Sequence, residues 1–254
     1  MIKFVHVTKR FKRHYALQDV SAQIANGSVV SLIGPNGSGK TTLIKSFLGM
    51  VTPDSGEIYF DNQLIHKQYK YRDRVGYMPQ IGRYPDNMKI GQVIDMIQNI
   101  RGVVSRELDN DLFNAFEIAS IKDKAMQSLS GGTRQKVSAT IAFMFNPEVY
   151  VLDEPTAGLD PMASEILKDK IIREKKRGKL ILLSSHILSD LEELTTDVMY
   201  LNEGRLQFFE TLDGIRELTG EQKLSKAIAA LMERNVLNKK VNIQTDHLTK
   251  LHSS

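Results

Sequence analysis

The sequence predicts an α/β fold in which a main sheet stands beside a small antiparallel sheet and a helical insertion. The main observation is three short apolar runs, which span residues 29–33, 149–152 and 180–183. Continuous apolar runs of four or five residues are typical of strands buried on both faces, as in parallel sheets. Each run is followed by a segment of helical character, at residues 41–50, 161–177 and 187–194. This alternation of strand and helix is the pattern of an α/β protein.

The remaining elements are predicted from shorter patterns. Alternating runs at residues 2–7 and 57–60 indicate an antiparallel sheet beside the main one. Apolar residues recur at helical spacing between residues 90 and 120, which indicates a helical insertion. Residues 212–234 are expected to form one or two amphipathic helices, and the polar tail at 235–254 is expected to fray.

Composition restricts the function classes. The chain has 254 residues, of which 41% are apolar and 25% charged, as in an ordinary globular protein. It contains no cysteine, so a thiolate metal site is excluded. No run of 18 apolar residues occurs and the N-terminus does not resemble a secretory signal, so we expect a protein that serves a membrane only from its surface. The net charge is +4, and the basic residues are interspersed with acidic ones. We therefore expect no nucleic-acid partner.

The most specific motif follows the first apolar run. It matches the phosphate-binding loop, and we expect it to bind nucleotide through Gly34, Pro35, Asn36, Gly37, Ser38, Gly39, Lys40, Thr41 and Thr42. Glycines allow successive N–H groups to surround phosphate oxygens, and the helix that follows points its positive end at the same charge. Lys40 would contact the β and γ phosphates, and the Thr41 hydroxyl is placed to bind Mg²⁺.

Two carboxylates end the second apolar run. Asp153 and Glu154 would lie at the C-terminal edge of the sheet, where open α/β sheets bind ligands. We expect Asp153 to hold Mg²⁺ and Glu154 to act as general base for the attacking water. An acidic strand-to-loop turn without function is the alternative, and the neighbouring phosphate loop makes it the weaker one.

Further motifs resemble those of the ABC ATPase family, and the similarity covers residues 2–215. The segment 129–135, Leu-Ser-Gly-Gly-Thr-Arg-Gln, resembles the family's signature and stands shortly before Asp153. Four other landmarks follow the family's pattern, namely Gln80 for the Q-loop, Asp160 in residues 157–161 for the D-loop, His186 for the switch histidine and Phe11 for the aromatic that stacks on adenine. The resemblance therefore implies a P-loop ABC ATPase fold with a mixed core sheet, a small antiparallel β subdomain and a helical subdomain.

The resemblance also implies a mechanism shared between two chains. ABC ATPases form head-to-tail homodimers that hold two ATP molecules, with Ser130, Gly131 and Gly132 facing the partner's γ phosphate and Asp160 contacting the partner. Gln80 would act at Mg²⁺ and the attacking water, and His186 would sense the γ phosphate. Tyr15 remains an alternative to Phe11 for adenine stacking.

One residue departs from the family's pattern. Thr133 stands where the signature most often has Gln after its two glycines. A threonine hydroxyl can still donate a hydrogen bond, but it reaches less far than a glutamine amide. We therefore expect altered contacts to the ribose of the partner's nucleotide, with Ser130 to Gly132 retained.

The expected organisation is an ATPase domain at residues 1–215, with its helical subdomain at about 82–135, and a short C-terminal extension at 216–254. Because the extension is too short for a regulatory β domain, the chain resembles the ATPase of an exporter whose transmembrane permease subunits are separate proteins. It would then lie at the cytoplasmic face of the cell membrane. Residues 133–138 and 142–145 look similar to ATPases of copper-processing exporters that assist nitrous oxide reductase maturation. The alternative class is a non-transport ABC ATPase that acts on ribosomes or DNA.

Overall fold

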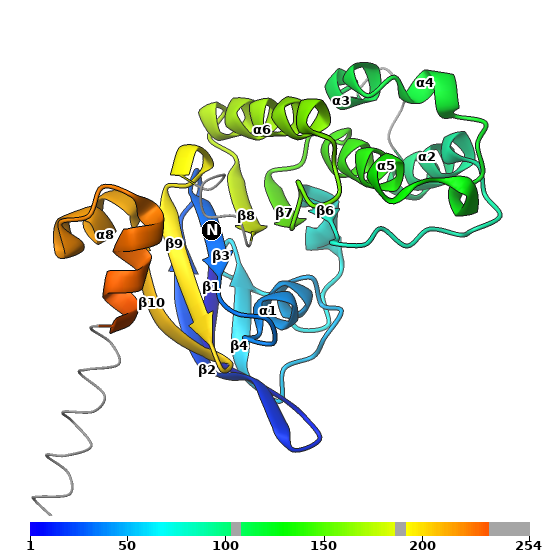
Figure 1. Ribbon diagram of the computed structural model, residues 1–254. Helices are drawn as coiled ribbons and strands as arrows, with labels where there is room; N and C mark the ends of the chain where they lie inside the picture. Colours follow the sequence, from blue (N-terminus) through cyan, green and yellow to red (C-terminus); the bar gives the residue numbers. More distant parts are fainter. Residues whose placement is uncertain (103–107, 186–191, 234–254) are drawn as a thin grey trace, which may run out of the picture.

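The computed structural model describes residues 1–102, 108–185 and 192–233, which form two sheets flanked by helices (Figure 1). The strands are β1 (Ile2–Phe11), β2 (His14–Ile24), β3 (Val29–Ile33), β4 (Ser55–Phe60), β5 (Gln63–Leu64), β6 (Val75–Met78), β7 (Val149–Asp153), β8 (Leu180–Ser184), β9 (Asp197–Asn202) and β10 (Arg205–Thr211). The helices are α1 (Lys40–Phe47), η1 (Lys70–Arg74), α2 (Ile90–Arg101), α3 (Asp111–Ala115), α4 (Ile118–Ile121), η3 (Met126–Ser128), α5 (Gly131–Phe143), α6 (Pro161–Lys176) and α8 (Leu212–Thr219). A further helix spans residues 224–233.

The larger sheet is mixed, as predicted. Its six strands lie in the order β10-β9-β3-β8-β7-β6. All neighbouring pairs are parallel except β10 with β9, which is antiparallel. The three apolar runs of the sequence are β3, β7 and β8, which lie together in the middle of this sheet.

Side chains of these three strands alternate between two hydrophobic clusters. On β7, Val149 and Val151 belong to the cluster that includes α1 and the smaller sheet. Tyr150 and Leu152 belong to the cluster that includes α2, α5 and α6. All four side chains are buried. The runs are therefore continuously apolar because each face of the strand is covered by a different layer.

The smaller sheet confirms the predicted antiparallel pairing. Its order is β2-β1-β4-β5, and β1 pairs antiparallel with both β2 and β4. β1 extends to Phe11, beyond the predicted run at residues 2–7, because it forms a hairpin in which Phe11 lies opposite His14. Residues 9–14 of this hairpin include the basic residues Lys9, Arg10, Lys12 and Arg13.

Helices in the predicted insertion and C-terminal region are also observed. α2, α3 and α4 lie within residues 90–121, and α8 and the helix at 224–233 occupy the predicted amphipathic segment. Leu212, Ile215, Leu224 and Ala227 bury their side chains in the same cluster as α5 and α6. Most of the helix predicted at residues 187–194 and the whole tail at 235–254 fall outside the described residues. In the described ranges, no helix is long and apolar enough to cross a membrane.

A buried lysine joins the helical insertion to the rest of the fold. Lys170 on α6 is fully buried, and its ammonium contacts the carboxylates of Asp109, Asp111 (2.9 Å) and Glu174 (3.1 Å). Burial alone would lower the pKa of Lys170, but hydrogen bonds to the three carboxylates raise it above its usual value. Asp109 and Asp111 belong to the insertion, so this cluster fixes α6 against it.

We expect Lys170→Met to destabilise the protein by about 3–5 kcal/mol, because it removes the buried cation shared by three carboxylates and leaves Glu174 paired with Arg177 alone. Urea unfolding of the full chain measures this difference. The matched control is Lys176→Met on the exposed side of the same helix, which should change the free energy of unfolding by less than about 0.5 kcal/mol. Equal stability of the two variants would contradict the proposed importance of the cluster.

Candidate functional site

The loop at residues 34–41 joins β3 to α1 at the carboxyl edge of the larger sheet (Figure 1). Two of its glycines have no room for a side chain. A Cβ on Gly34 would lie 2.1 Å from the carbonyl oxygen of Leu201, and one on Gly39 would lie 2.3 Å from that of Ala16. Both glycines also have positive φ angles, of 150° and 108°. The loop can therefore follow this tight path only with glycine at these positions.

The N-terminus of α1 faces the concave side of this loop. The helix begins at Lys40, and its N-cap residue is Gly39, which offers no side-chain hydrogen bond to the first turn. The first N–H groups of a helix have no partner within the helix, and they favour anions. The sequence thus leaves these donors available to a phosphate group.

Lys40 lies against the loop itself. Its ammonium donates to the carbonyl oxygens of Gly34 (2.6 Å) and Pro35 (3.1 Å). An ammonium has three donors, so one N–H remains for another acceptor. Burial lowers the pKa of Lys40, and the charges of Glu154 and Asp153 oppose this shift. The lysine therefore lies against the phosphate loop and within the electrostatic field of the predicted general base Glu154 and the predicted Mg²⁺ ligand Asp153.

Asp153 is held at the end of β7 by two hydroxyl groups. Its carboxylate accepts a hydrogen bond from Ser184 Oγ (2.5 Å), and Thr41 Oγ1 lies 3.5 Å from its other oxygen. Only 3% of Asp153 is exposed. The structure therefore brings two of the three predicted Mg²⁺ ligands, Thr41 and Asp153, together, although they are 112 positions apart in the chain.

Glu154 and Gln80 form a direct pair. Gln80 Nε2 donates to Glu154 Oε2 at 2.8 Å. The backbone N–H of Glu154 is held by Ser184 Oγ at 3.0 Å, and the residue has a positive φ of 52°. Non-glycine residues adopt this conformation at an energetic cost, which is commonly found at functional sites. The local backbone thus turns the glutamate side chain out of the sheet toward Gln80.

These groups surround a cavity of about 480 Å³, which we call the phosphate cavity. Most of its lining was predicted from the sequence, namely Asn36, Gly37, Ser38, Gly39, Lys40, Thr41, Thr42, Gln80 and Glu154. His14 and Ala16 of β2 complete the lining and were not predicted. Gly34, Pro35 and Asp153 lie behind this surface, where they hold Lys40 and Thr41.

Phe11, the predicted adenine-stacking residue, is close in sequence to His14 and Ala16, which line this cavity. Phe11 itself does not line it. Phe11 ends β1 and is 48% exposed, with the Lys9 ammonium 5.4 Å from its ring centre. The alternative aromatic, Tyr15, is 41% exposed and lies under the guanidinium of Arg10 at 5.7 Å. Both rings are accessible, so the geometry does not separate the two candidates.

The signature segment begins α5 and lies away from the phosphate cavity. Ser130 is the N-cap of α5, and its hydroxyl accepts from the backbone N–H of Thr133 at 3.2 Å. The Thr133 side chain also contacts this hydroxyl, at 2.8 Å. Ser130 and Gly131 are exposed, and none of residues 130–132 lines the cavity. Within one chain, the signature and the phosphate loop are therefore separate surfaces.

Asp160 connects the D-loop to the signature helix of the same chain. Its carboxylate caps α6 by accepting from Ala163 N (2.8 Å), and it pairs with Lys136 of α5 at 2.7 Å. The hydrogen bond from Lys136 and that from Ala163 lower the pKa of Asp160. A Cβ on Gly132 would lie 2.8 Å from the carbonyl oxygen of Gly158, so the two segments also touch through their backbones.

Three functional contacts were not predicted from the sequence. Ser184 Oγ donates to the Asp153 carboxylate and accepts from the Glu154 backbone N–H, Lys136 pairs with Asp160, and Gln135 Nε2 donates to the carbonyl oxygen of Glu154 at 3.4 Å. Among these residues, only Ser184 could have been singled out from the sequence, because it directly follows the apolar run at residues 180–183. The predicted switch residue His186 lies outside the described residues.

Comparison with known proteins identifies the family of this chain. The family model described as ABC transporter matches residues 17–157. The ABC transporter ATP-binding protein YhaQ of Bacillus subtilis is 31% identical over 229 residues, which cover 89% of this chain and 76% of YhaQ. The Nod factor export ATP-binding protein I of Burkholderia thailandensis is 32% identical, covering 80% and 68% of the two chains. The lantibiotic transport ATP-binding protein SrtF of Streptococcus pyogenes is 30% identical, covering 86% and 94%.

Solved structures show the same fold. An ATP-binding subunit of an ABC transporter superposes with a TM-score of 0.84 at 28% identity, covering 91% of this chain and 99% of the other. A dimeric post-hydrolysis ATP-binding cassette, bound to ADP and Pi, superposes with a TM-score of 0.74 at 24% identity, covering 84% and 99%. The matched region contains both the phosphate loop and the two carboxylates of the site. The chain therefore belongs to the ABC transporter family, as an ATP-binding subunit that hydrolyses ATP.

Proposed function

We propose that two copies of this chain close head to tail around two ATP molecules and drive separate transmembrane permease subunits. The observation that carries this proposal is the separation of Ser130 to Gly132 from the phosphate cavity of their own chain. An exposed helix N-terminus preceded by a serine is suited to a phosphate group that another molecule presents. In a head-to-tail pair, each signature segment would meet the nucleotide held by its partner's phosphate loop.

The residues at the phosphate cavity fit a magnesium ion. Thr41 and Asp153 present oxygen atoms to the same region, and the Gln80 side chain reaches it from β6. Oxygen ligands of this kind are those that Mg²⁺ prefers. We assign Thr41, Asp153 and Gln80 as the residues that would hold it. The ion would neutralise phosphate charge during transfer to water.

In the proposed reaction, Glu154 accepts the proton of the attacking water. Gln80 orients this carboxylate through the 2.8 Å hydrogen bond, and Ser184 fixes the backbone on which it stands. Lys40 and the N–H groups at the start of α1 bind the phosphates. Because His186 follows β8 closely in the sequence, we keep it as the proposed γ-phosphate sensor. Phe11, or alternatively Tyr15, would cover the adenine.

Asp160 has a proposed role at the contact between the two chains. In the structure its carboxylate is already shared between Ala163 N and Lys136, which fixes the loop that would face the partner. We therefore propose that Asp160 acts at the interface by presenting a rigid loop as well as by direct contact.

A second hollow provides a docking surface for a permease subunit. It has a volume of about 370 Å³ and lies between α1, β6, α2 and α5; we call it the α2 groove. Apolar side chains such as Met50, Ile97 and Phe145 line it together with Arg72, Arg83 and Arg101. Arg101 is fixed over the Phe145 ring at 4.6 Å and donates to the Val75 carbonyl at 3.0 Å. Such a groove suits a short amphipathic helix that carries acidic residues.

Docking to a permease would place the chain at the cytoplasmic face of the cell membrane as a peripheral subunit. We propose residues 1–215, including the helical subdomain at about 82–135, as the ATPase unit and residues 216–254 as its extension. The mixed signs of surface charge give no support to the alternative of a non-transport ATPase acting on ribosomes or DNA.

Export is the transport direction that we propose, because two of the relatives are named for export of Nod factor and transport of lantibiotics. The finer proposal of a copper-processing exporter rests on residues 133–138 and 142–145. Most of these residues lie on α5, and Val137, Ala142 and Phe143 are buried in the core. Their identity is thus explained by packing, and the cargo would be identified from the permease that co-purifies.

We expect Glu154→Gln to retain ATP binding and to lower steady-state hydrolysis by at least about 100-fold, because the general base is lost. The amide oxygen of the new side chain can still accept from Gln80, so the site should keep its shape. Light scattering with ATP and Mg²⁺ should then show a trapped dimer. Glu165→Gln, on the exposed side of α6, is the control and should stay active. A strictly monomeric Glu154→Gln protein would refute the shared site.

We expect Lys40→Ala to weaken ATP binding by about 10- to 100-fold, because a charge-assisted contact to phosphate is removed. Titration with a fluorescent nucleotide measures the affinity. Lys45→Ala is the matched control, since Lys45 is exposed on the same helix and lies outside the phosphate cavity. If both variants bind nucleotide as tightly as the original chain, Lys40 does not contact phosphate.

We expect Met50→Lys to prevent co-purification with the membrane subunit while ATP binding by the isolated chain is unchanged. Met50 lines the α2 groove and is 59% exposed, so its replacement adds a charge to an apolar contact without disturbing the core. The control is Ile100→Lys, whose side chain is 76% exposed on α2 but does not line the groove. Co-purification from detergent extracts should be retained in the control; loss in both variants, or in neither, argues against this docking surface.

A further inference from the structure

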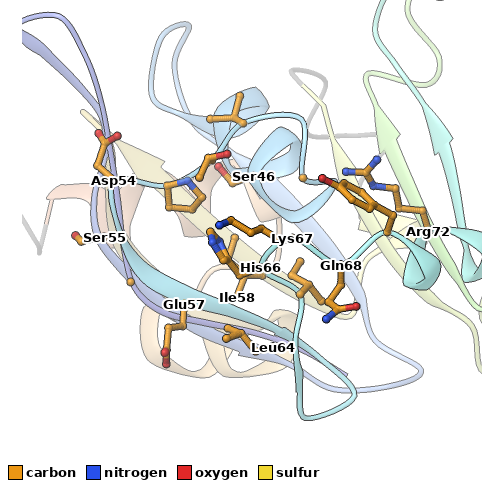
Figure 2. A pocket seen from close by; sticks show the side chains of 17 residues that line it. Ser46, Asp54, Ser55, Glu57, Ile58, Leu64, His66, Lys67, Gln68 and Arg72 are labelled. Carbon is orange, nitrogen blue, oxygen red and sulfur yellow. The ribbon is translucent and has the colours of Figure 1, made fainter.

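A separate cavity of about 440 Å³ lies beside the smaller sheet, and we call it the β4 cavity (Figure 2). Its walls come from the end of α1 and the loop that follows, from β4, and from residues 64–69 with Arg72. It shares no residue with the phosphate cavity. Its volume falls within the range of about 300–1,000 Å³ that is usual for small-molecule sites.

Two buried polar groups on the walls of this cavity have no hydrogen-bond partner within the described residues. They are the hydroxyl of Ser46, a residue that is only 2% exposed, and Nε of Arg72. A buried donor without a partner costs about 1–3 kcal/mol. Such groups are normally satisfied, and both residues line the cavity, so a molecule bound there could complete them after a small rotation of either side chain.

Lys67 and Arg72 give the lining of the β4 cavity two positive charges. Of its two carboxylates, Asp54 is neutralised by Lys9, whose Nζ donates to it at 2.8 Å, whereas Glu57 accepts from the neutral Tyr59 hydroxyl at 2.6 Å and is not neutralised by it. The lining therefore carries a net positive charge. The side chains of His66 and Lys67 make no such contact in the described part of the chain. Figure 2 shows both near the middle of the cavity, below Ser46.

The remaining surface is apolar or aromatic. Ile58 and Ile65 are buried at the floor, and Leu64 is 42% exposed at the rim. Tyr69 is 64% exposed, and the Arg72 guanidinium lies 4.9 Å from its ring centre. An arginine stacked on an aromatic ring is well suited to a flat anion. Water would satisfy the two orphaned groups but would not use these apolar walls.

From these observations we infer that the β4 cavity binds a small organic anion that has an apolar body. Its phosphate or carboxylate group would pair with Lys67 and Arg72 and accept from Ser46. Its apolar part would lie against Ile58, Ile65 and Leu64. Binding itself does not depend on the proposed transport function. Arg72 also lines the α2 groove, so the ligand would share this side chain with the surface proposed for the permease.

The test uses the full chain saturated with ADP, so that the phosphate cavity is filled. Three probes of similar size are titrated, namely phenyl phosphate, benzoate and the neutral benzyl alcohol, with inorganic phosphate as a fourth. Calorimetry gives the affinity, and amide NMR spectra locate the site. We expect saturable binding of at least one aromatic anion, with shifts concentrated in residues 46–72. Inorganic phosphate and benzyl alcohol should each bind at least about 5-fold more weakly.

Variants distinguish specific binding in the β4 cavity from non-specific attraction of anions to the basic surface. Lys67→Met should weaken binding of the aromatic anion about 10-fold, and Ser46→Ala should weaken it by a smaller factor. Lys70→Met is the control, because Lys70 is exposed on η1 and does not line the cavity. No saturable binding, equal affinity for benzyl alcohol, or equal loss in the Lys67 and Lys70 variants would overturn the inference. The ATP-dependent dimer of Glu154→Gln is unaffected by any of these results, so the two proposals fail separately.

Discussion

The parallel alignment of β3, β8 and β7 is the constraint on which the whole site depends. Because β8 lies between the other two strands, Ser184 at its end can reach the carboxylate of Asp153 and the backbone of Glu154. The loop after β3 then brings Thr41 toward Asp153 across the same edge. A slip of one residue in any of these pairings would turn these side chains to the opposite face of the sheet. The catalytic geometry is therefore a property of strand register.

The same constraint explains which parts of the fold could be predicted from the sequence. The runs at residues 29–33, 149–152 and 180–183 are apolar on both faces, so their burial could be inferred without knowing their neighbours. The order of these strands in the sheet could not be predicted, because an evenly apolar strand does not indicate which of its faces packs against which helix. The irregular hairpin of β1 and β2 also escaped prediction, since its length depends on cross-strand contacts.

At the candidate site, the residues in contiguous motifs were predictable and those that support them from elsewhere in the chain were not. Gly34 to Thr42 form one motif, in which Gly34 and Gly39 are required by close backbone approaches. Ser184 and Lys136 act on residues 31 and 24 positions away, and no local pattern marks them. The β4 cavity likewise joins α1, β4 and Arg72, and it follows only from the way these elements pack.

The contacts between the signature and the D-loop suggest why these two motifs occur in the same chain. Gly132 lies against the Gly158 carbonyl too closely for any side chain, and Lys136 binds Asp160, so the two segments are in direct contact. Gln135, on the same helix, contacts the carbonyl oxygen of Glu154. A phosphate that acts on the start of α5 would therefore act on a unit that includes the D-loop and reaches Glu154, the proposed general base. If that phosphate belongs to the partner's nucleotide, each site is physically joined to the other through α5. The departure at Thr133 fits this arrangement, because its hydroxyl turns back to Ser130 and strengthens the N-cap on which the unit depends.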